Sequence, residues 1–327
     1  MKKLGFIIIR KPFSAHTHLR QGKELADVLP SSNIYGAVVC MGNIQPPVSD
    51  FQGVRKYRAE IIRQNPQFLP ILTLMLTKDT TAETLKRARE EGIRVVKFMP
   101  DAATTNALSG ITLPDLEKFY PVIGEIKRLN MIFSGHWELA VDPKTGKEIP
   151  YSEREEAALP YFDKLVKAFP NMNIIFEHVS TAAAVEFIKA TPANVAATIT
   201  AHHISKTHKD VFGADGKIID PHYFCYPVLK KEGDRLAVAS AYANPKFFFG
   251  PDDAPHPKER KMGDKPAGGI FSPAFIALPT VLEVCEELGL VEHFERFVSL
   301  RGPTFYDLQP PPEKESRSRY CRQRRQY

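Results

Sequence analysis

The chain has 327 residues, of which 43% are hydrophobic and 25% are charged, and its formal net charge is +6. This composition is that of a globular protein with a sizeable core, and no apolar run approaches the roughly 18 residues of a membrane span. The four cysteines are scattered and form no C-x-x-C pair, which argues against a zinc ribbon or disulfide framework and favours a reducing cytoplasm.

Short β-branched or aromatic runs alternate with longer amphipathic segments along the chain. The eight candidate strands are 13–18, 35–43, 68–76, 93–100, 131–138, 173–180, 194–200 and 246–253. Helix-like stretches include 81–92, 113–130, 152–169 and 181–190; Ser152 with Glu155 predicts a capping box, and Gly92 predicts a helix stop. Apolar strands that alternate with helices indicate a parallel sheet covered on both faces. Eight such units predict a (β/α)8 TIM barrel, with a doubly wound open sheet as the alternative.

The positive charge is concentrated at the C-terminal end. Residues 313–327 hold six Lys or Arg and two Glu, a net charge of +4, which leaves +2 for the rest of the chain. A basic domain surface, and with it a nucleic-acid partner, is therefore not predicted. We expect one domain over residues 1–312 and a basic, disordered tail over residues 313–327.

Side chains that can bind a metal lie at the ends of five of these strands. His16 and His18 end the first strand and Arg20 follows at the same spacing, so period-2 alternation places all three on one face. The other members are Lys97, His136, His178 and Asp252. Each alone has a structural interpretation, such as a hydrogen-bonded histidine, a lysine that reaches solvent or an aspartate in a turn. Together they predict a metal site at the C-terminal ends of the strands, where barrel enzymes build their active sites.

Lys97 is the unusual member, because a protonated lysine is a poor metal ligand. Burial removes the charge of a lysine readily, and a neutral amine can add carbon dioxide to give a carbamate, N6-carboxylysine, that bridges two metals. Two zinc ions bring four positive charges, and the carbamate, Asp252 and a bridging hydroxide bring three negative charges. Binuclear sites generate hydroxide near neutral pH, so Asp252 is expected to be the catalytic general base and then acid. Manganese or cobalt also suits these ligands.

Eight stretches between residues 13 and 308 carry a family likeness. They read HTHLRQG, MGNIQPPV, VVKFMPDAATTNALSGIT, HWE, IIFEHVST, AATITAHH, CYPVLKK and GPDDAPH. In these stretches the chain resembles the class II, single-function dihydroorotases of the amidohydrolase superfamily. The resemblance implies a TIM barrel that catalyses the reversible cyclisation of N-carbamoyl-L-aspartate to L-dihydroorotate in de novo pyrimidine biosynthesis. It also implies a homodimer.

The same resemblance implies roles for individual residues. One zinc ion would be bound by His16, His18 and Asp252, and the other by His136 and His178, with carboxylated Lys97 as the bridge. Arg20 and Asn43 are implied to hold the substrate carboxylate, where a guanidinium forms a charge-assisted, bidentate pair. The remaining implied substrate contacts are Thr104 and Thr105 on a mobile loop, His256, and backbone groups at Tyr226 and Gly268.

Several positions depart from the family pattern. Trp137, the only tryptophan, follows His136 where glycine is usual, so its indole is expected either to narrow the pocket or to point away from it. Gly42 stands where Met-Pro-Asn is usual, Pro251-Asp252-Asp253 replaces Thr-Asp-Ser, and the basic run after Pro312 replaces the family's last segment. These changes bear on efficiency and substrate choice more than on metal binding.

Other readings of the sequence remain open. His202, His203 and His208 form either a second metal site or a set of loop or pocket side chains, and Cys225 is expected to be a buried thiol. A related cyclic amidase, such as a dihydropyrimidinase or hydantoinase, acts on substrates without the ring carboxylate, so Arg20 and Asn43 disfavour it. An inactive metal-binding scaffold is the third possibility.

Overall fold

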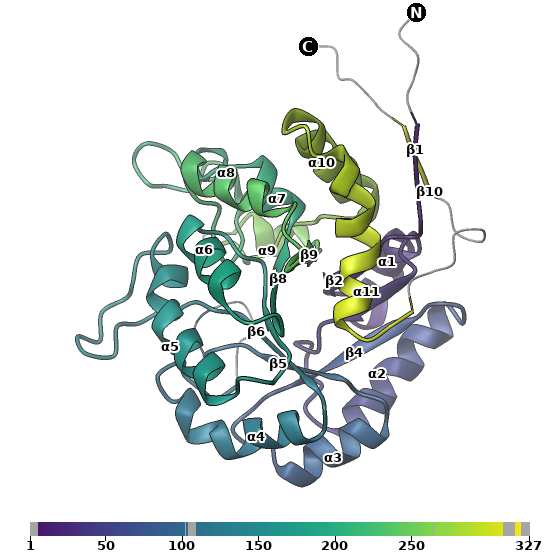
Figure 1. Ribbon diagram of the computed structural model, residues 1–327, viewed down its shortest axis with the longest axis vertical. Coiled ribbons are helices and arrows are strands. Elements are labelled where there is room, and N and C mark those ends of the chain that lie inside the picture. Colours follow the sequence, from purple (N-terminus) through teal and green to yellow (C-terminus); the bar gives the residue numbers. More distant parts are fainter. Residues whose placement is uncertain (1–5, 102, 104–108, 264, 310–317, 322–327) are drawn as a thin grey trace, which may run out of the picture.

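Eight parallel strands form a barrel in which sheet order is chain order (Figure 1). The computed structural model describes residues 6–101, 103, 109–263, 265–309 and 318–321. The strands are β2 (Phe13–Thr17), β3 (Ala37–Cys40), β4 (Pro70–Met75), β5 (Val95–Phe98), β6 (Ile132–Gly135), β7 (Ile174–Phe176), β8 (Val195–Ile199) and β9 (Phe247–Phe249). A parallel bridge between Thr17 and Asp253 joins the first strand to the segment after the last. The predicted TIM barrel is confirmed, and the open doubly wound sheet is wrong.

Helices connect the strands and cover the outside of the barrel (Figure 1). They are α1 (Gly22–Ser32), α2 (Phe51–Gln64), α3 (Ala82–Glu90), α4 (Tyr120–Arg128), α5 (Arg154–Ala168), α6 (Ala182–Ala190), α7 (Ala201–Ser205), α8 (Glu232–Ala241), α9 (Lys258–Lys261), α10 (Ala274–Glu287) and α11 (Arg301–Phe305). Gly92 follows α3 with φ of +85°, as a helix stop requires. The predicted capping box is wrong, because α5 has no side-chain cap and Glu155 is buried against Ser180 and Thr181.

Two apolar layers hold the barrel together. The larger layer lies between the strands and the surrounding helices, and it includes Trp137, Phe162 and Phe176. The smaller layer fills the barrel interior with side chains from successive strands, among them Phe13, Ala15, Val39, Met41, Val95, Ile132, Ile175, Ala196 and Phe248. Tyr306, which follows α11, packs on Phe13 and Phe248. The interior is therefore a packed core below the polar ends of the strands.

A short two-stranded sheet lies beside the barrel. Strand β1 (Phe6–Ile9) pairs antiparallel with β10 (Ser318–Cys321). Part of the segment expected to be a disordered tail is thus a strand, because its backbone finds a partner near the other end of the chain. The remainder of residues 313–327 lies outside the described residues, and the domain boundary at Pro312 stays a prediction.

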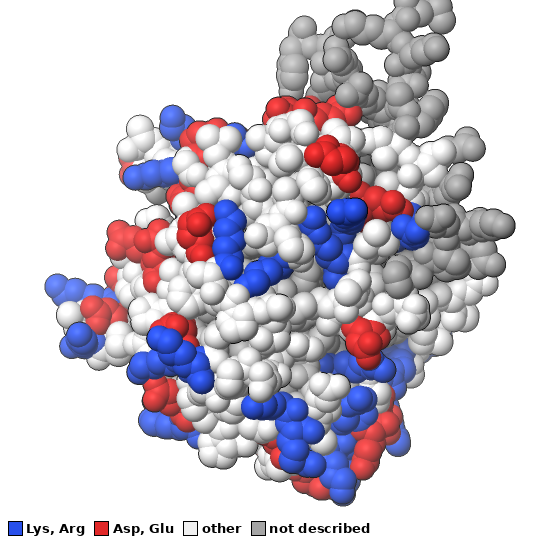
Figure 2. Space-filling view, in the orientation of Figure 1, with Lys and Arg blue, Asp and Glu red and all other residues white. Residues whose placement is uncertain are grey.

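Charged side chains of both signs are interspersed over the face shown in Figure 2. The segment that carries most of the excess positive charge lies largely outside the described residues. Within the described part of the chain, the helices are all too short or too polar to cross a bilayer.

Candidate active site

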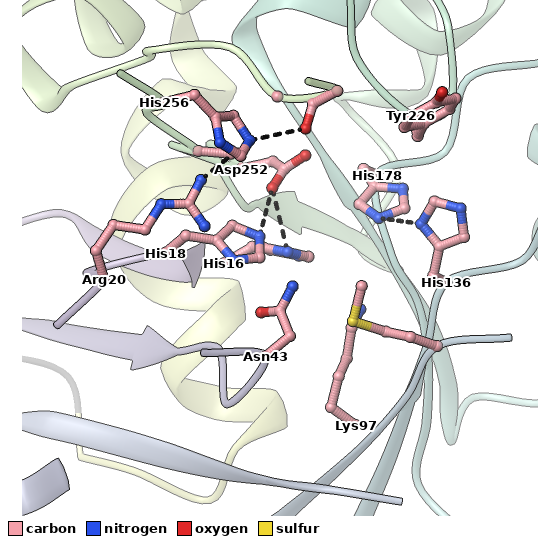
Figure 3. Close-up of a pocket in the computed structure, with 14 residues that line it drawn as sticks. His16, His18, Arg20, Asn43, Lys97, His136, His178, Tyr226, Asp252 and His256 are labelled. Carbon is pink, nitrogen blue, oxygen red and sulfur yellow. Dashed lines mark hydrogen bonds and ion pairs between the residues drawn. The ribbon is translucent and has the colours of Figure 1, made fainter. Parts of the chain in front are cut away.

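A polar pocket opens at the C-terminal ends of the strands (Figure 3). Its lining contains all the predicted site residues that the structure describes, namely His16, His18, Arg20, Asn43, Lys97, His136, His178, Tyr226, Asp252, His256 and Gly268. Met99, Ala254 and Gly269, which sequence analysis did not single out, complete the lining. Thr104 and Thr105 lie outside the described residues. Residues far apart in the sequence therefore meet in one pocket, as the barrel prediction requires.

The backbone that carries several pocket residues is irregular. It does not keep the period-2 alternation from which a common face for His16, His18 and Arg20 was predicted. In β2 the register shifts between Ser14 and Thr17, whose hydroxyls contact each other at 2.6 Å. Arg20, beyond the strand, has φ of +60°. His178 and Asp252 also have positive φ, +41° and +45°. Such conformations are costly for residues other than glycine and cluster at functional sites, so the side chains are turned into the pocket by irregular backbone and not by strand period alone.

His16, His18 and Asp252 form one half of the site. Asp252 Oδ1 lies 3.2 Å from Nε2 of each histidine. Burial lowers the pKa of His18 to about 4 despite the nearby Asp252 carboxylate. Burial by itself raises the pKa of Asp252, but the electrostatic effect of His16 and the hydrogen bond from His18 outweigh it and hold that pKa well below its usual range. At neutral pH this half therefore presents a neutral His18 imidazole beside an ionised carboxylate.

His136 and His178 form the other half of the site. His136 Nδ1 lies 3.2 Å from His178 Nε2, and His136 Nε2 lies 2.8 Å from the buried Glu138 carboxylate. Because a carboxylate accepts the Nε2–H, the Nδ1 lone pair of a neutral His136 faces the pocket. Burial and the neighbouring His136 hold the pKa of His178 well below its usual value.

Lys97 lines the pocket, and the fully buried Glu177 lies behind it. Lys97 Nζ has no hydrogen-bond partner among the described residues, and Glu177 Oε1 is 4.0 Å away. Burial lowers the pKa of Lys97, and the Glu177 charge only partly opposes it. Glu177 also accepts hydrogen bonds from His16 Nδ1 at 2.8 Å and Thr198 Oγ1 at 2.7 Å. Sequence analysis missed this residue, although Glu177 has the same strand parity as the inward-facing Ile175.

A second wall of the pocket carries cationic and amide groups. Arg20 donates from Nε to Pro255 O at 2.8 Å, and its Nη2 lies 3.3 Å from His256 Nε2. Burial together with the Arg20 charge lowers the pKa of His256 to about 3, so this ring is neutral. The buried Asn43 Oδ1 has no partner among the described residues. Arg20, His256 and Asn43 are labelled around the same opening in Figure 3.

Trp137 points away from the pocket. Its indole is fully buried and packs edge-on against Phe162 of α5 at 4.7 Å and beside Phe176 at 6.2 Å, measured between ring centroids. A Cβ atom at Gly135 would lie 2.6 Å from the indole, so Gly135 leaves room for the ring. Of the two expectations, the pocket is not narrowed by Trp137, and the indole belongs to the outer apolar layer.

His202, His203 and Cys225 lie together, with potential ligand atoms within 4.8 Å of one another. His203 uses both ring nitrogens in hydrogen bonds, to Thr200 Oγ1 and to Pro227 O. Burial raises the pKa of the Cys225 thiol far above its usual value, as expected for a buried thiol. The charge of Lys261 also lowers the pKa of both His202 and Cys225, so a divalent cation would meet an existing positive charge. His208 does not belong to this group; its ring stacks on Phe212.

Comparison with known proteins gives a consistent result. No family model matches the chain. A dihydroorotase of Azoarcus sp. (strain BH72) is 35% identical over 316 residues, which cover 94% of this chain and 89% of that protein. A dihydroorotase of Vibrio vulnificus (strain YJ016) is 38% identical over 92% of this chain and 87% of that protein.

Solved structures agree with the sequence relatives. Dihydroorotase from Saccharomyces cerevisiae, in complex with 5-fluoroorotic acid, has a TM-score of 0.86 and 31% identity over 93% of this chain and 86% of that chain. Dihydroorotase from Campylobacter jejuni has a TM-score of 0.83 and 28% identity over 98% and 89%. An L-hydantoinase from Arthrobacter aurescens, at 16% identity over 93% of this chain and 72% of that chain and a TM-score of 0.75, shares the fold alone. With relatives of this identity along nearly its whole length and the predicted residues gathered in one pocket, the chain belongs to the dihydroorotase family and is a cyclic amidohydrolase.

Proposed function

We propose that this protein interconverts N-carbamoyl-L-aspartate and L-dihydroorotate with two zinc ions and a carboxylated Lys97. The observation that carries the proposal is the combination of two features in one pocket. Four histidines, Lys97 and Asp252 line one side, and Arg20, Asn43 and His256 line the other. The first set fits metals, and the second fits the carboxylate of a substrate whose reacting amide lies over those metals.

The buried polar atoms of the pocket support metal binding. Glu177 and Glu138 each accept a hydrogen bond from one nitrogen of a histidine and leave the other nitrogen directed at the pocket. This outer contact fixes the ring and its tautomer, as is usual for metal-binding histidines. His16, His18 and Asp252 would hold one ion, His136 and His178 the other, and Lys97 both. When bound, the two ions would make a water molecule reactive near neutral pH and polarise the carbonyl that it attacks.

Lys97 needs both its burial and the metals to become a carbamate. Burial lowers its pKa and so favours the neutral amine that adds carbon dioxide. The Glu177 carboxylate, 4.0 Å from Nζ, would however repel a carbamate oxygen. Carboxylation is therefore expected together with metal binding, because only the metal charge offsets this repulsion.

Asp252 is placed to move the proton of the reaction. Its carboxylate is ionised at neutral pH and so able to accept a proton from the attacking water. In ring opening it would then pass that proton to the departing ring nitrogen, and in ring closure the same steps run in reverse. Arg20, Asn43 and His256 hold the substrate carboxylate and so orient the ring with its amide towards Asp252.

The carboxylate-binding wall favours a dihydroorotase over a dihydropyrimidinase-like amidase. A substrate such as dihydrouracil lacks the carboxylate and would leave Arg20 and Asn43 without the anionic group that we propose they hold. Leaving buried polar groups unpaired is costly, so a site built for them rejects the analogue strongly. A metal-binding scaffold without catalysis is disfavoured, because all six predicted metal ligands line the pocket.

Turnover measured beside metal content tests the proposal. Purified protein should carry two zinc ions and interconvert the two compounds, followed by ultraviolet absorbance, with far less turnover of dihydrouracil. Arg20→Ala should cripple turnover of dihydroorotate and leave the zinc content unchanged. Zinc content near zero, or no turnover with metal and bicarbonate supplied, would refute the proposal. Loss of zinc together with turnover in Arg20→Ala would instead make Arg20 structural.

A homodimer in the cytoplasm completes the proposal, with the small-molecule substrate as its ligand and no nucleic-acid or membrane partner. The family resemblance supports the dimer, and the scattered cysteines support a reducing compartment. Three of these cysteines, Cys40, Cys225 and Cys285, are buried free thiols. Sedimentation at micromolar concentration tests the dimer directly.

A further inference from the structure

Lys261 is a buried cation whose partners are all backbone carbonyls. It ends the short helix α9, and only 5% of the residue is exposed. Its Nζ donates to Phe224 O at 2.9 Å, Ala267 O at 3.0 Å and Gly269 O at 2.7 Å. An ammonium has three N–H donors, so these carbonyls use all of them. The Asp220 carboxylate acts on Lys261 through its charge, whereas the hydrogen bonds of Nζ go to these backbone carbonyls.

The three carbonyls belong to two different segments of the pocket wall. Phe224 lies two residues before Tyr226, and Ala267 and Gly269 flank Gly268; both Tyr226 and Gly268 line the pocket. The backbone N–H of Gly269 also donates to Phe224 O at 3.0 Å. The segments touch closely, because a Cβ atom at Gly268 would lie 2.2 Å from the Tyr226 ring. Lys261 thus fastens both segments at one point behind the wall.

The same wall contacts His256 and, through it, Arg20, the two side chains that are proposed to face the substrate carboxylate. Gly268 O, on the residue between the two fastened carbonyls, lies 3.1 Å from His256 Nε2. The same ring nitrogen lies 3.3 Å from Arg20 Nη2. Figure 3 shows His256 beside Arg20, with Tyr226 on the opposite side of the opening. A shift of the Gly268 segment would therefore move both the His256 ring and the space in front of Tyr226.

Burial of a charge without a hydrogen-bonded anion is costly, and a packed apolar side chain at the same place is often no less stable. The Lys261 ammonium thus contributes more to holding the pocket wall in position than to the stability of the core. We propose that Lys261 is a positioning residue for substrate binding, which fixes the wall formed by Tyr226, Gly268 and His256 in its binding shape. The inference rests on the proposed dihydroorotase function and adds a residue outside the pocket to it.

Lys261→Met tests this role, because methionine is similarly long and unbranched but has no donor. We expect the KM for dihydroorotate to rise at least about tenfold, kcat to change less than about threefold, and zinc content to stay the same. Lys246→Met is the matched control. Its Nζ also donates to backbone carbonyls, including Ile188 O at 2.9 Å, but it precedes β9, at the end of the barrel away from the pocket. Its KM should equal that of the unaltered protein.

The unaltered protein offers a second test that needs no variant to fold. Burial lowers the pKa of Lys261 to about 8, so its third donor is lost as the pH rises through that value. The groups that act on it are Asp220, Cys225 and His202. Cys225 has a strongly raised pKa and His202 a pKa of about 4, so neither titrates between pH 7 and 9. KM should therefore rise above pH 8 in the unaltered protein and stay flat in Lys261→Met.

The outcomes separate the two proposals. If the unaltered protein turns over dihydroorotate and Lys261→Met changes KM less than twofold, the role of Lys261 is wrong and the proposed function stands. An equal rise of KM in Lys246→Met, or loss of zinc from Lys261→Met, also overturns the role of Lys261. If Lys261→Met does not fold, a KM of the unaltered protein that is constant from pH 7 to 9 overturns it. No turnover by the unaltered protein overturns both proposals.

Discussion

Gly135→Ala should destabilise the protein because Trp137 occupies the space that a methyl group needs. The new Cβ would lie 2.6 Å from the indole, whereas ordinary contact begins at 3.4 Å, so the ring must move by about 0.8 Å. The ring cannot move freely, since Phe98, Phe133, Phe162 and Phe176 surround it. Overpacking of this kind costs about 1–3 kcal/mol, and we expect the upper end of that range.

A double-mutant cycle isolates the contact. Trp137→Ala should itself cost about 3–5 kcal/mol through the cavity that it leaves. In that background Gly135→Ala should gain about 0.5–1 kcal/mol, because alanine is favoured over glycine within a strand. The effect of Gly135→Ala thus changes sign, and the coupling energy should be about 3–4 kcal/mol.

Urea unfolding of the metal-free proteins measures these values without a contribution from metal affinity. Gly124→Ala in α4 is the control, because the nearest atom to its new Cβ, in Phe169, is 3.8 Å away. It should stabilise the protein by about 0.5–1 kcal/mol. Additive effects of Gly135→Ala and Trp137→Ala, or a change below about 0.5 kcal/mol in Gly135→Ala alone, would refute the steric explanation.

Two buried carboxylates give further predictions. Glu177→Gln should lower metal affinity about 10–100-fold, measured by chelator competition, because it weakens the contact that orients His16; an affinity equal to that of the exposed control Glu83→Gln would contradict this. The charges of Lys97 and His16 outweigh burial and lower the pKa of Glu177 from 4.5 to about 2. The stability that Glu177 contributes is thus present above pH 4.5 and lost as the pH falls towards 2, so acid unfolding of the metal-free protein should be steeper over that range than in Glu177→Gln. Parallel curves would show that Glu177 carries no such linkage. Glu155→Ala strips the acceptor from the N–H and O–H groups of residues 180 and 181 and should cost about 3 kcal/mol in urea unfolding; a cost below about 1 kcal/mol would mean that water replaces the carboxylate.

Sequence periodicity predicted the barrel well, because each strand is a continuous apolar run between helical segments. It also placed His16, Lys97, His136, His178 and Asp252 at one rim, since the carboxyl ends of parallel strands meet there. The directions of the individual side chains could not be predicted, because they depend on irregular backbone that does not follow the strand period. The register shift in β2 and the positive φ of His178 and Asp252 decide which way these side chains point.

Residues that act through other residues were harder to find. Glu177, Glu138 and Lys261 are charged side chains in ordinary positions of the sequence, and their burial becomes visible only in three dimensions. The two glutamates are recognised by the histidine nitrogens they accept from, and Lys261 by three carbonyls from segments apart in the chain. The capping box failed for the same reason, because Glu155 found better donors across the fold than at its own helix end.

The seam that closes the barrel has a consequence for how the protein is made. Thr17 bridges to Asp253, and His18 N donates to Asp253 O at 2.9 Å, directly beside the Asp252 carboxylate. The ligands of the first half-site therefore come together only when the last strand docks against the first. Such long-range closure is among the slow steps of folding. A ribosome-bound chain that ends before residue 252 lacks this half-site, so the proposed metal binding there requires that the last strand has been made and has docked against the first.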